Sequence, residues 1–314
     1  MSVFTQVSHV QLKTFLRQYR LGELLGFQGI GEGVENSNFY VDTSDGRWVL
    51  TLFERLNYRD LPFFLGLMNH LARRGVPCPK PLTTKTGGTL TRLNRKPAAL
   101  VQRLNGQSVL FPAVKQCAAV GRLLGDLHHA GRGYQLRCKN SRGADWRAVT
   151  AKKLLPVVGA RTAVLIRDEL AAQAKLNLSQ LPQGVIHADL FKDNVLFVGP
   201  RLSGVIDFYY ACNDALLYDL AVTVNDWCFM PSGRFHARRA KALLAAYERK
   251  RALTAAERKA WPLTLRAAAF RFYLSRLHDW YFPRKGDVVH VKDPSEYRRI
   301  LEHHRQHASF ASPA

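Results

Sequence analysis

The chain has 314 residues, 47% hydrophobic and 22% charged, which is a globular balance and argues against intrinsic disorder. No run approaches the roughly 18 apolar residues of a membrane span, and residues 1–15 lack the features of a secretory signal, so we expect a cytoplasmic protein. The net charge of +22 would suit a nucleic-acid binder, but Lys and Arg are spread along the whole chain, so attraction of a small polyanion explains it equally well.

The N-terminal third of the sequence reads as a β-rich region. Ser8 with Gln11 has the Ser-x-x-Gln form of a capping box, and apolar residues at helical spacing follow, so a short helix is predicted there. Residues 24–53 predict β-structure, with apolar runs at 38–42 and 47–53 joined by a short polar turn.

A second helix is predicted from Leu61 to Leu71, where apolar residues recur at helical spacing before Gly75 and the prolines that follow it. A further strand-like run covers residues 98–104 and ends at Asn105. The pattern of the sequence changes from strand-like to mainly helical at this point, which predicts a domain boundary.

Helical patterns dominate the rest of the chain, beginning with 112–130 and 145–180, while residues 185–208 hold two short apolar strands around a polar loop. The sequence therefore predicts an α+β, bilobed architecture. A small β-rich N-terminal lobe of residues 1–105 precedes a larger, mainly helical lobe of residues 106–314.

The strongest functional signal is the run from His187 to Asn194, which has apolar residues on both sides. Its His-x-Asp-x-x-x-x-Asn spacing is that of a kinase catalytic loop. A hydroxyl is a weak nucleophile and needs a carboxylate to accept its proton, so Asp189 is the predicted catalytic base. Asn194 offers a neutral oxygen to Mg²⁺, and His187 is expected to orient the loop.

A second acidic residue ends the apolar run that begins at Gly204. Asp207, followed by Phe208, is similar to the metal-binding Asp-Phe-Gly element, with Tyr209 in place of its glycine. We predict that Asp207 binds Mg²⁺ together with Asn194. The order, the short separation and the strand flanks of the two patterns argue against a chance match.

A glycine-rich run at residues 29–38 lies between predicted strands. Glycines and short polar side chains allow backbone N–H groups to approach phosphate oxygens. This run fits no standard phosphate-loop pattern, but its place before the strands indicates a nucleotide-covering loop. Ser37 and Asn38 are its candidate contacts with the phosphates of ATP.

Thr51 stands where kinases of this architecture usually carry a phosphate-binding lysine. Arg55, Arg103 or a lysine elsewhere could replace that lysine, or loop amides and Mg²⁺ could suffice. The strand that ends with Gln102, Arg103 and Leu104 is predicted to form the hinge, whose backbone would pair with adenine.

Two other residue types argue against further metal or disulfide chemistry. Cysteines are odd in number and never spaced as Cys-x-x-Cys, which excludes a disulfide framework and a cysteine-rich zinc site. Adjacent histidines occur at 128–129 and 303–304, but neighbours on a helix point in different directions, so we expect no metal site there.

Together, these elements resemble the aminoglycoside phosphotransferase and choline kinase superfamily over nearly the whole chain. Within it the chain is most similar to the bacterial homoserine kinases of protein-kinase-like fold. The resemblance implies ATP and L-homoserine as substrates, Mg²⁺ as cofactor and a step toward threonine. The runs that carry it are 33–39, 49–54, 60–64, 187–194, 206–209, 217–228, 272–277 and 291–294.

A zwitterionic amino acid needs a cation for its carboxylate and an acceptor for its ammonium group. Arg271 and Arg276 are candidates for the cation, because arginine binds carboxylates with two parallel hydrogen bonds. Asp226, beside Trp227, is the candidate acceptor. Arg276 could instead pair with a helix carboxylate, and Trp227 could belong to the core. Asp219 is expected to brace the catalytic loop.

Two alternatives stay open at this point. The first is another small-molecule kinase of the same superfamily, acting on choline, an aminoglycoside or a related amino alcohol; polycationic aminoglycosides suit a protein of charge +22 poorly. The second is a basic nucleic-acid-binding pseudokinase, against which the presence of Asp189, Asn194 and Asp207 argues. We therefore expect neither a nucleic-acid nor a membrane partner.

Overall fold

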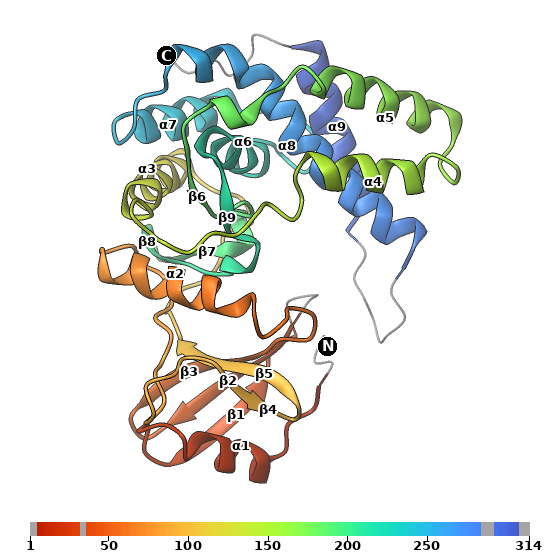
Figure 1. Cartoon of the computed structure of the whole chain (residues 1–314). Helices are drawn as coiled ribbons and strands as arrows, with labels where there is room; N and C mark the ends of the chain where they lie inside the picture. The colour runs from red at the N-terminus through yellow and green to blue at the C-terminus, as the bar shows by residue number, and fades with distance from the viewer. Residues whose placement is uncertain (1–4, 32–35, 284–291, 308–314) are drawn as a thin grey trace. The chain divides into compact units, whose positions relative to one another are not determined.

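The computed structural model describes residues 5–31, 36–283 and 292–307 (Figure 1). The described residues up to Asn105 form one compact unit, and those from Gly106 onward form another. The predicted α+β class is confirmed, because the first unit is built on a small antiparallel sheet and the second is mainly helical.

The N-terminal unit contains a five-stranded antiparallel sheet in the order β1-β2-β3-β5-β4. Strand β2 alternates between buried and half-buried residues, as expected for a strand with one face on a core. The elements of this unit are α1 (His9–Leu16), β1 (Leu24–Gly29), β2 (Ser37–Thr43), β3 (Gly46–Leu52), α2 (Leu61–Arg73), β4 (Thr91–Leu93) and β5 (Lys96–Gln102).

Helix α1 begins at the predicted capping box. The hydroxyl of Ser8 accepts the N–H of Gln11, and the Gln11 side chain accepts the N–H of Ser8 in return. This reciprocal pair satisfies two of the amides that a helix leaves unpaired at its N-terminus. Leu12 and Phe15 then pack from α1 into the same core as Val41 of β2.

The predicted strand 98–104 is two residues shorter at its C-terminal end than expected. The N–H of Gln102 donates to the carbonyl of Lys80, and the N–H of Arg103 donates to that of Arg47. The pairing of β5 with β3 ends at Gln102 and Trp48, so Arg103 and Leu104 lie outside the strand.

The C-terminal unit has a long central helix, α8, which packs against α4, α5, α6 and α9, while α3 packs against α7 (Figure 1). None of the helices in the described ranges is both long and apolar enough to cross a bilayer. The helices of the C-terminal unit are α3 (Val114–Ala130), α4 (Ala144–Leu154), α5 (Ala160–Gln173), α6 (Leu216–Trp227), α7 (Ala237–Glu248), α8 (Ala255–Tyr281) and α9 (Pro294–Gln306).

The helical pattern predicted over 145–180 is interrupted in the structure. Helix α4 ends just before Pro156, a residue that disfavours continuation of a helix because it lacks an N–H group. Helix α5 starts after Gly159, and a short 3₁₀ turn (Leu178–Gln180) completes the segment.

Helices α3 and α7 approach each other closely because α3 carries glycine at the contact. A Cβ atom added at Gly121 would lie 2.1 Å from the carbonyl oxygen of Leu243 on α7, which no real side chain tolerates. This close packing fixes the C-terminal part of α3, which carries His128, against α7.

Four short strands flank the predicted catalytic loop and form two separate antiparallel pairs. Strand β6 (Gln183–Ile186) pairs with β9 (Cys212–Ala215), and β7 (Val195–Val198) pairs with β8 (Arg201–Val205). The two apolar strands expected around the loop are therefore present as β6 and β7. They do not pair with each other, because β6 pairs with β9 and β7 pairs with β8.

Candidate active site

The loop between β6 and β7 is held by a single buried carboxylate. Asp219, at the start of α6, accepts the backbone N–H of His187 through Oδ2 at 2.7 Å and that of Ala188 through Oδ1 at 2.8 Å. Ala188 has a φ of 63°, a left-handed conformation that a side chain disfavours. The carboxylate thus stabilises a strained backbone immediately before Asp189.

Asp189 and Asn194 come together at the two ends of this loop. The amide nitrogen of Asn194 donates to the carbonyl oxygen of Asp189 at 2.8 Å and lies 3.3 Å from its Oδ2. Because the nitrogen is used in this way, the amide oxygen of Asn194 is the atom left to bind a metal ion. Asp189 itself is half-buried.

His187 connects the loop to the segment that carries Asp207. Its Nδ1 accepts the N–H of Asp189 at 3.3 Å, so its Nε2 carries the proton and donates to the carbonyl of Ile206 at 3.0 Å. Ile206 also donates its N–H to the carbonyl of Asn194 at 2.9 Å. These contacts bring Asn194 and Asp207 to the same end of the β7–β8 hairpin.

Asp207 is exposed and has a φ of 62°, so it too occupies the left-handed region. The turn that follows it, Phe208–Tyr210, is a single 3₁₀ turn whose Phe208 ring packs 4.8 Å from the His187 ring. Asn194 and Asp207 offer hard oxygen ligands of the kind that Mg²⁺ prefers. Within the described ranges, this site included, no group of three or more His, Cys, Asp or Glu side chains is placed to hold a metal ion.

A chain of buried polar groups extends from Asp219 away from the loop. His128 Nε2 lies 3.1 Å from Asp219 Oδ2, and His128 Nδ1 lies 2.8 Å from the hydroxyl of Tyr247. Arg251 donates from Nε to that hydroxyl at 2.6 Å and binds both carboxylate oxygens of Glu257 at 2.6 and 3.1 Å.

The direction of each hydrogen bond in this chain follows from the arginine at its end. Arginine can only donate, so the Tyr247 oxygen accepts from Arg251 and gives its own proton to His128 Nδ1. The proton of the neutral imidazole must then sit on Nε2 and point at Asp219. Burial lowers the pKa of His128, which keeps the ring neutral.

The same arrangement keeps Asp219 charged. Burial alone would raise the pKa of this carboxyl, but the hydrogen bond from His128 and the His187 backbone N–H hold it below its ordinary value. A charged carboxylate is the stronger acceptor for the two loop amides.

His128 was not predicted as a site residue. The sequence offered one signal, because His128 follows Val120 and Leu124 at intervals of four and so lies on the buried stripe of α3. Its partners Tyr247 and Arg251 lie on and just beyond α7, more than a hundred residues away, and no local pattern links them to the loop.

Asp226, the predicted acceptor for a substrate ammonium group, lies next to the catalytic loop. Its Oδ2 accepts the backbone N–H of Lys192 at 2.7 Å, and its Oδ1 lies 4.0 Å from the Lys192 ammonium nitrogen. Only 11% of the Asp226 side chain is exposed, and burial raises its pKa to about 6.

The other predicted substrate residues differ in their surroundings. Trp227 is fully buried and donates its indole N–H to the carbonyl of Leu190 at 3.0 Å, as a core residue does. Arg276 forms an ion pair with Glu296 at 2.6 Å, the structural role that the sequence left open for it. Arg271 is 4% exposed and stacks over the Phe272 ring at 3.7 Å.

In the N-terminal unit, the predicted phosphate contacts sit in a polar cluster. Ser37 is fully buried and donates to Glu54 Oε1 at 2.7 Å, while Lys96 binds Glu54 Oε2 at 3.1 Å. Thr51 donates its hydroxyl to Asn38 Oδ1 at 2.8 Å. The Asn38 amide nitrogen is therefore better placed to meet a ligand than the Ser37 hydroxyl. Residues 32–35 of the glycine-rich run lie outside the described residues.

The predicted hinge residues also differ from one another. The backbone N–H groups of Gln102 and Arg103 donate to carbonyl groups of the same unit, as described above. Among the described hydrogen bonds, none involves the backbone N–H of Leu104. The Arg103 guanidinium stacks 3.8 Å over the Tyr40 ring. Arg55, the other candidate cation, is exposed.

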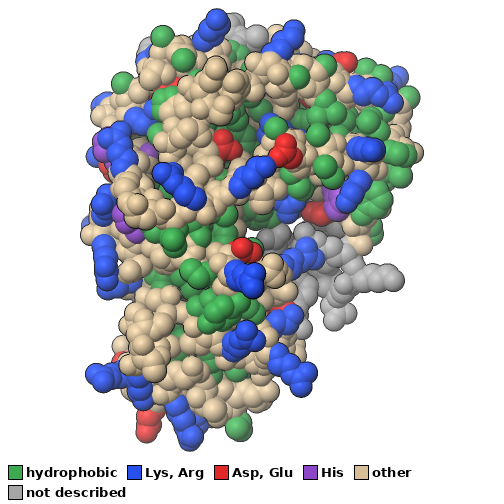
Figure 2. Space-filling view, viewed as in Figure 1, with side chains coloured by type: hydrophobic (Ala, Val, Ile, Leu, Met, Phe, Trp, Pro, Cys, Tyr) green, Lys and Arg blue, Asp and Glu red, His purple; other side chains and the backbone are tan. Residues whose placement is uncertain are grey.

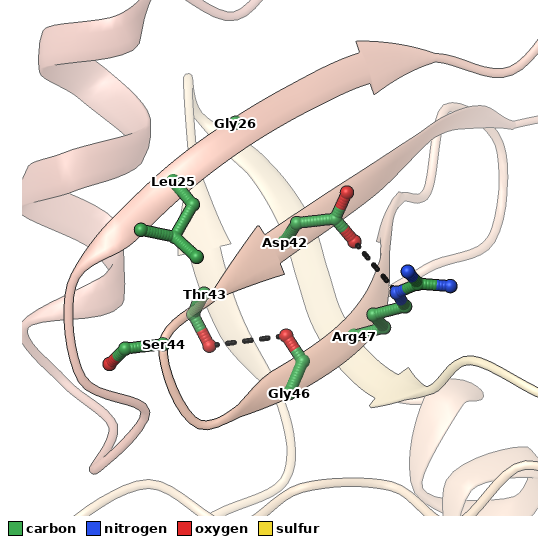
Figure 3. Close-up of a pocket in the computed structure, with 7 residues that line it drawn as sticks. All are labelled: Leu25, Gly26, Asp42, Thr43, Ser44, Gly46 and Arg47. Carbon is green, nitrogen blue, oxygen red and sulfur yellow. Dashed lines mark hydrogen bonds and ion pairs between the residues drawn. The ribbon is translucent and has the colours of Figure 1, made fainter.

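A pocket in the N-terminal unit is lined by none of these residues (Figure 3), although its Asp42 lies 3.8 Å from Arg103. It sits at the β2–β3 turn, where Thr43 donates its hydroxyl to the carbonyl of Gly46 and Arg47 lies 3.9 Å from Asp42. We assign it no function, because it contains none of the predicted site residues. Its lining residues are Leu25, Gly26, Asp42, Thr43, Ser44, Gly46 and Arg47.

The visible face of the molecule in Figure 2 carries dispersed positive charge. On the face shown in Figure 2, Lys and Arg side chains are scattered over both units, with only a few acidic side chains between them.

Comparison with known proteins gives these observations a family context. The profile described as "Phosphotransferase enzyme family" matches residues 26–253. The homoserine kinase of Methylobacillus flagellatus is 50% identical, over 96% of this chain and 95% of that protein. The homoserine kinase of Methylobacterium radiotolerans is 48% identical, over 98% of this chain and 97% of its own length.

Solved structures of similar fold come from more distant proteins. An amicoumacin kinase in complex with AMP-PNP and Ca²⁺ has a TM-score of 0.71 and 14% identity, covering 98% of this chain and 96% of its own. A microcompartment-associated aminopropanol kinase has a TM-score of 0.70 and 15% identity, covering 97% and 96%. At such low identity the likeness concerns the fold alone.

Proposed function

The chain belongs to the phosphotransferase enzyme family, and we propose that it transfers the γ-phosphoryl group of ATP to the side-chain hydroxyl of L-homoserine. The product is O-phospho-L-homoserine, an intermediate on the way to threonine. The assignment of homoserine rests on the full-length similarity to homoserine kinases.

The observation that carries the chemistry is the geometry of the catalytic loop. Asp189 follows a strained residue whose backbone is fixed by Asp219, and Asn194 closes the loop by binding the Asp189 carbonyl. A rigid loop of this kind presents one half-buried carboxylate in a constant position. Positioning of the reacting groups is the main contribution that a protein makes to phosphoryl transfer.

In the proposed mechanism, Asp189 accepts the proton of the homoserine hydroxyl as the oxygen attacks the γ-phosphorus atom, while the bond from that phosphorus to the β–γ bridging oxygen breaks and ADP leaves. Asn194 and Asp207 would hold Mg²⁺, which supplies positive charge to the phosphate oxygens when it is bound. His187 keeps the two ligand residues in register through its contacts with Asp189 and Ile206.

The nucleotide contacts that we propose in the N-terminal unit are fewer than the sequence suggested. The Asn38 amide nitrogen is proposed to bind phosphate, since its Oδ1 is already engaged by Thr51. The backbone of Leu104 is proposed to pair with adenine. Lys96 takes no phosphate role in this proposal because Glu54 pairs with it.

The cytoplasm is the proposed location. All five cysteines, four of them buried, are free thiols, as expected for a protein kept in a reducing compartment.

The test is turnover of ATP by the purified protein in the presence of Mg²⁺. L-homoserine, L-serine, choline and kanamycin are offered in parallel at equal concentrations, and the phosphorylated product is identified by mass spectrometry. We expect turnover with homoserine to exceed that with each other acceptor. Turnover with choline or kanamycin but not with homoserine would keep the catalytic assignment and overturn the substrate.

A further inference from the structure

Arginine side chains gather around one tyrosine ring beside the catalytic loop. The Arg142 guanidinium carbon lies 5.7 Å from the centroid of the Tyr210 ring and 4.7 Å from that of Trp146. Arg271 lies 5.1 Å from the same Tyr210 ring and 3.7 Å from that of Phe272. A tyrosine that closes the turn after Asp207 thus contacts two guanidinium groups.

Among the described residues, these guanidinium groups have no anionic partner. Across residues 5–31, 36–283 and 292–307, no carboxylate or hydrogen-bond acceptor contacts the side chain of Arg142, Arg147 or Arg271, although Arg147 is only 6% exposed and Arg271 only 4%. The nearby Asp214 is engaged instead by the Asn140 side chain at 2.7 Å and by the backbone N–H of Ala215.

Other arginines of the same unit show the usual arrangement. Arg251, Arg266 and Arg276 each pair with a glutamate at 2.6–2.7 Å. Burying a guanidinium without a counter-charge is costly, so an unpaired, buried arginine beside a catalytic loop indicates a ligand that supplies the charge. The exception therefore indicates an anion site.

A neighbouring hydroxyl gives independent support. Tyr218, at the start of α6, is 2% exposed, and its hydroxyl has no hydrogen-bond partner in the part of the chain that the structure describes. Burial raises the pKa of this phenol, and the charges of Arg147 and Arg271 oppose the rise. An enclosed, unpaired hydroxyl that is influenced by the charges of two arginines is suited to donate a hydrogen bond to the same anion.

The arginines are connected to both parts of the catalytic site. Phe272, which follows Arg271 on α8, packs 4.6 Å from the ring of Phe191, two residues after Asp189. Tyr210 lies three residues after Asp207. An anion bound by Arg271 would therefore be close to the catalytic loop.

We propose that Arg271, assisted by Arg142, binds the carboxylate of the amino-acid substrate and makes the enzyme select an amino acid over an amino alcohol. This inference rests on the proposed function. It chooses Arg271 over Arg276, which already has its carboxylate in Glu296.

The experiment compares L-homoserine with 3-amino-1-propanol, which is the same molecule without its carboxylate. In Arg271→Gln, we expect kcat/KM for homoserine to fall by about 100-fold, the usual cost of removing one partner from a buried ion pair. For 3-amino-1-propanol we expect a change of less than about threefold, since that acceptor never made the contact. Arg142→Gln should lower kcat/KM for homoserine by a smaller factor than Arg271→Gln and should leave that for 3-amino-1-propanol almost unchanged.

The matched control is Arg201→Gln, which removes one positive charge from an exposed position on β8 and should change neither acceptor. Equal loss on both acceptors in a folded Arg271→Gln protein would overturn the proposal, because it would indicate a role in phosphate binding. Unchanged homoserine kinetics in Arg271→Gln and Arg142→Gln would also overturn it. Failure of the wild-type protein to use homoserine would instead overturn the proposed function.

Discussion

The polar chain behind the catalytic loop makes a prediction that a single oxygen atom can test. In Tyr247→Phe, the hydroxyl that joins Arg251 to His128 is lost, while the ring that packs between α3 and α7 is kept. His128 is then free to carry its proton on Nδ1, which would turn an unprotonated Nε2 toward Asp219. The carboxylate that holds the loop would lose a donor and meet a lone pair.

Two effects of different size follow from this substitution. Two buried groups, His128 Nδ1 and Arg251 Nε, lose their partner, which should lower the free energy of unfolding by about 2–4 kcal/mol. Loss of the fixed tautomer should loosen the loop amides bound by Asp219. Because misplacement of a reacting group by about 1 Å can cost up to about 100-fold in rate, we expect kcat to fall by about 10- to 100-fold.

The assay measures kcat and the KM for ATP with homoserine as acceptor, and stability by urea denaturation, at a temperature where both proteins are folded. Tyr273→Phe is the control, because Tyr273 is a buried tyrosine of the same unit that lies outside the polar chain. A Tyr247→Phe protein that is destabilised as expected but keeps wild-type kcat would refute the positioning role. It would leave the chain as a purely structural network.

Two further predictions concern stability. Burial raises the pKa of Asp226 to about 6 from an ordinary 3.8, so the folded state binds more protons than the unfolded chain between these values. The free energy of unfolding should therefore fall as pH rises through that window, by about 1.4 kcal/mol per pH unit, and Asp226→Asn should abolish the fall. Urea denaturation from pH 4 to 7 checks this, and equal slopes in both proteins would contradict it. Gly121→Ala should destabilise by about 1–3 kcal/mol, because its Cβ would meet the Leu243 carbonyl at 2.1 Å; a melting temperature equal to that of the wild type would disprove the close α3–α7 contact.

Local patterns in the sequence predicted the elements that depend on neighbouring residues. The capping box of Ser8 and Gln11 places the start of α1, and the spacing between Asp189 and Asn194 predicts the two residues that meet across the loop. In both cases the interacting residues lie within one turn or one short loop. Chain connectivity alone then brings them together.

The sequence could not distinguish arginines that differ only in their partners. Arg271 and Arg276 lie on the same helix, and the partner of Arg276, Glu296, is 20 residues away on α9. Likewise, the link from His128 to Tyr247 spans 119 residues. Such contacts depend on the packing of whole helices, which periodicity does not report.

The most direct test of the central claim is the turnover of Asp189→Ala with ATP and L-homoserine. Loss of the base that accepts the hydroxyl proton should lower kcat by about 100-fold or more and leave the KM for ATP within about threefold of the wild-type value. Asp193→Ala removes an exposed carboxylate from the same loop and should retain most of the activity. An Asp189→Ala protein with near-normal kcat would contradict the account.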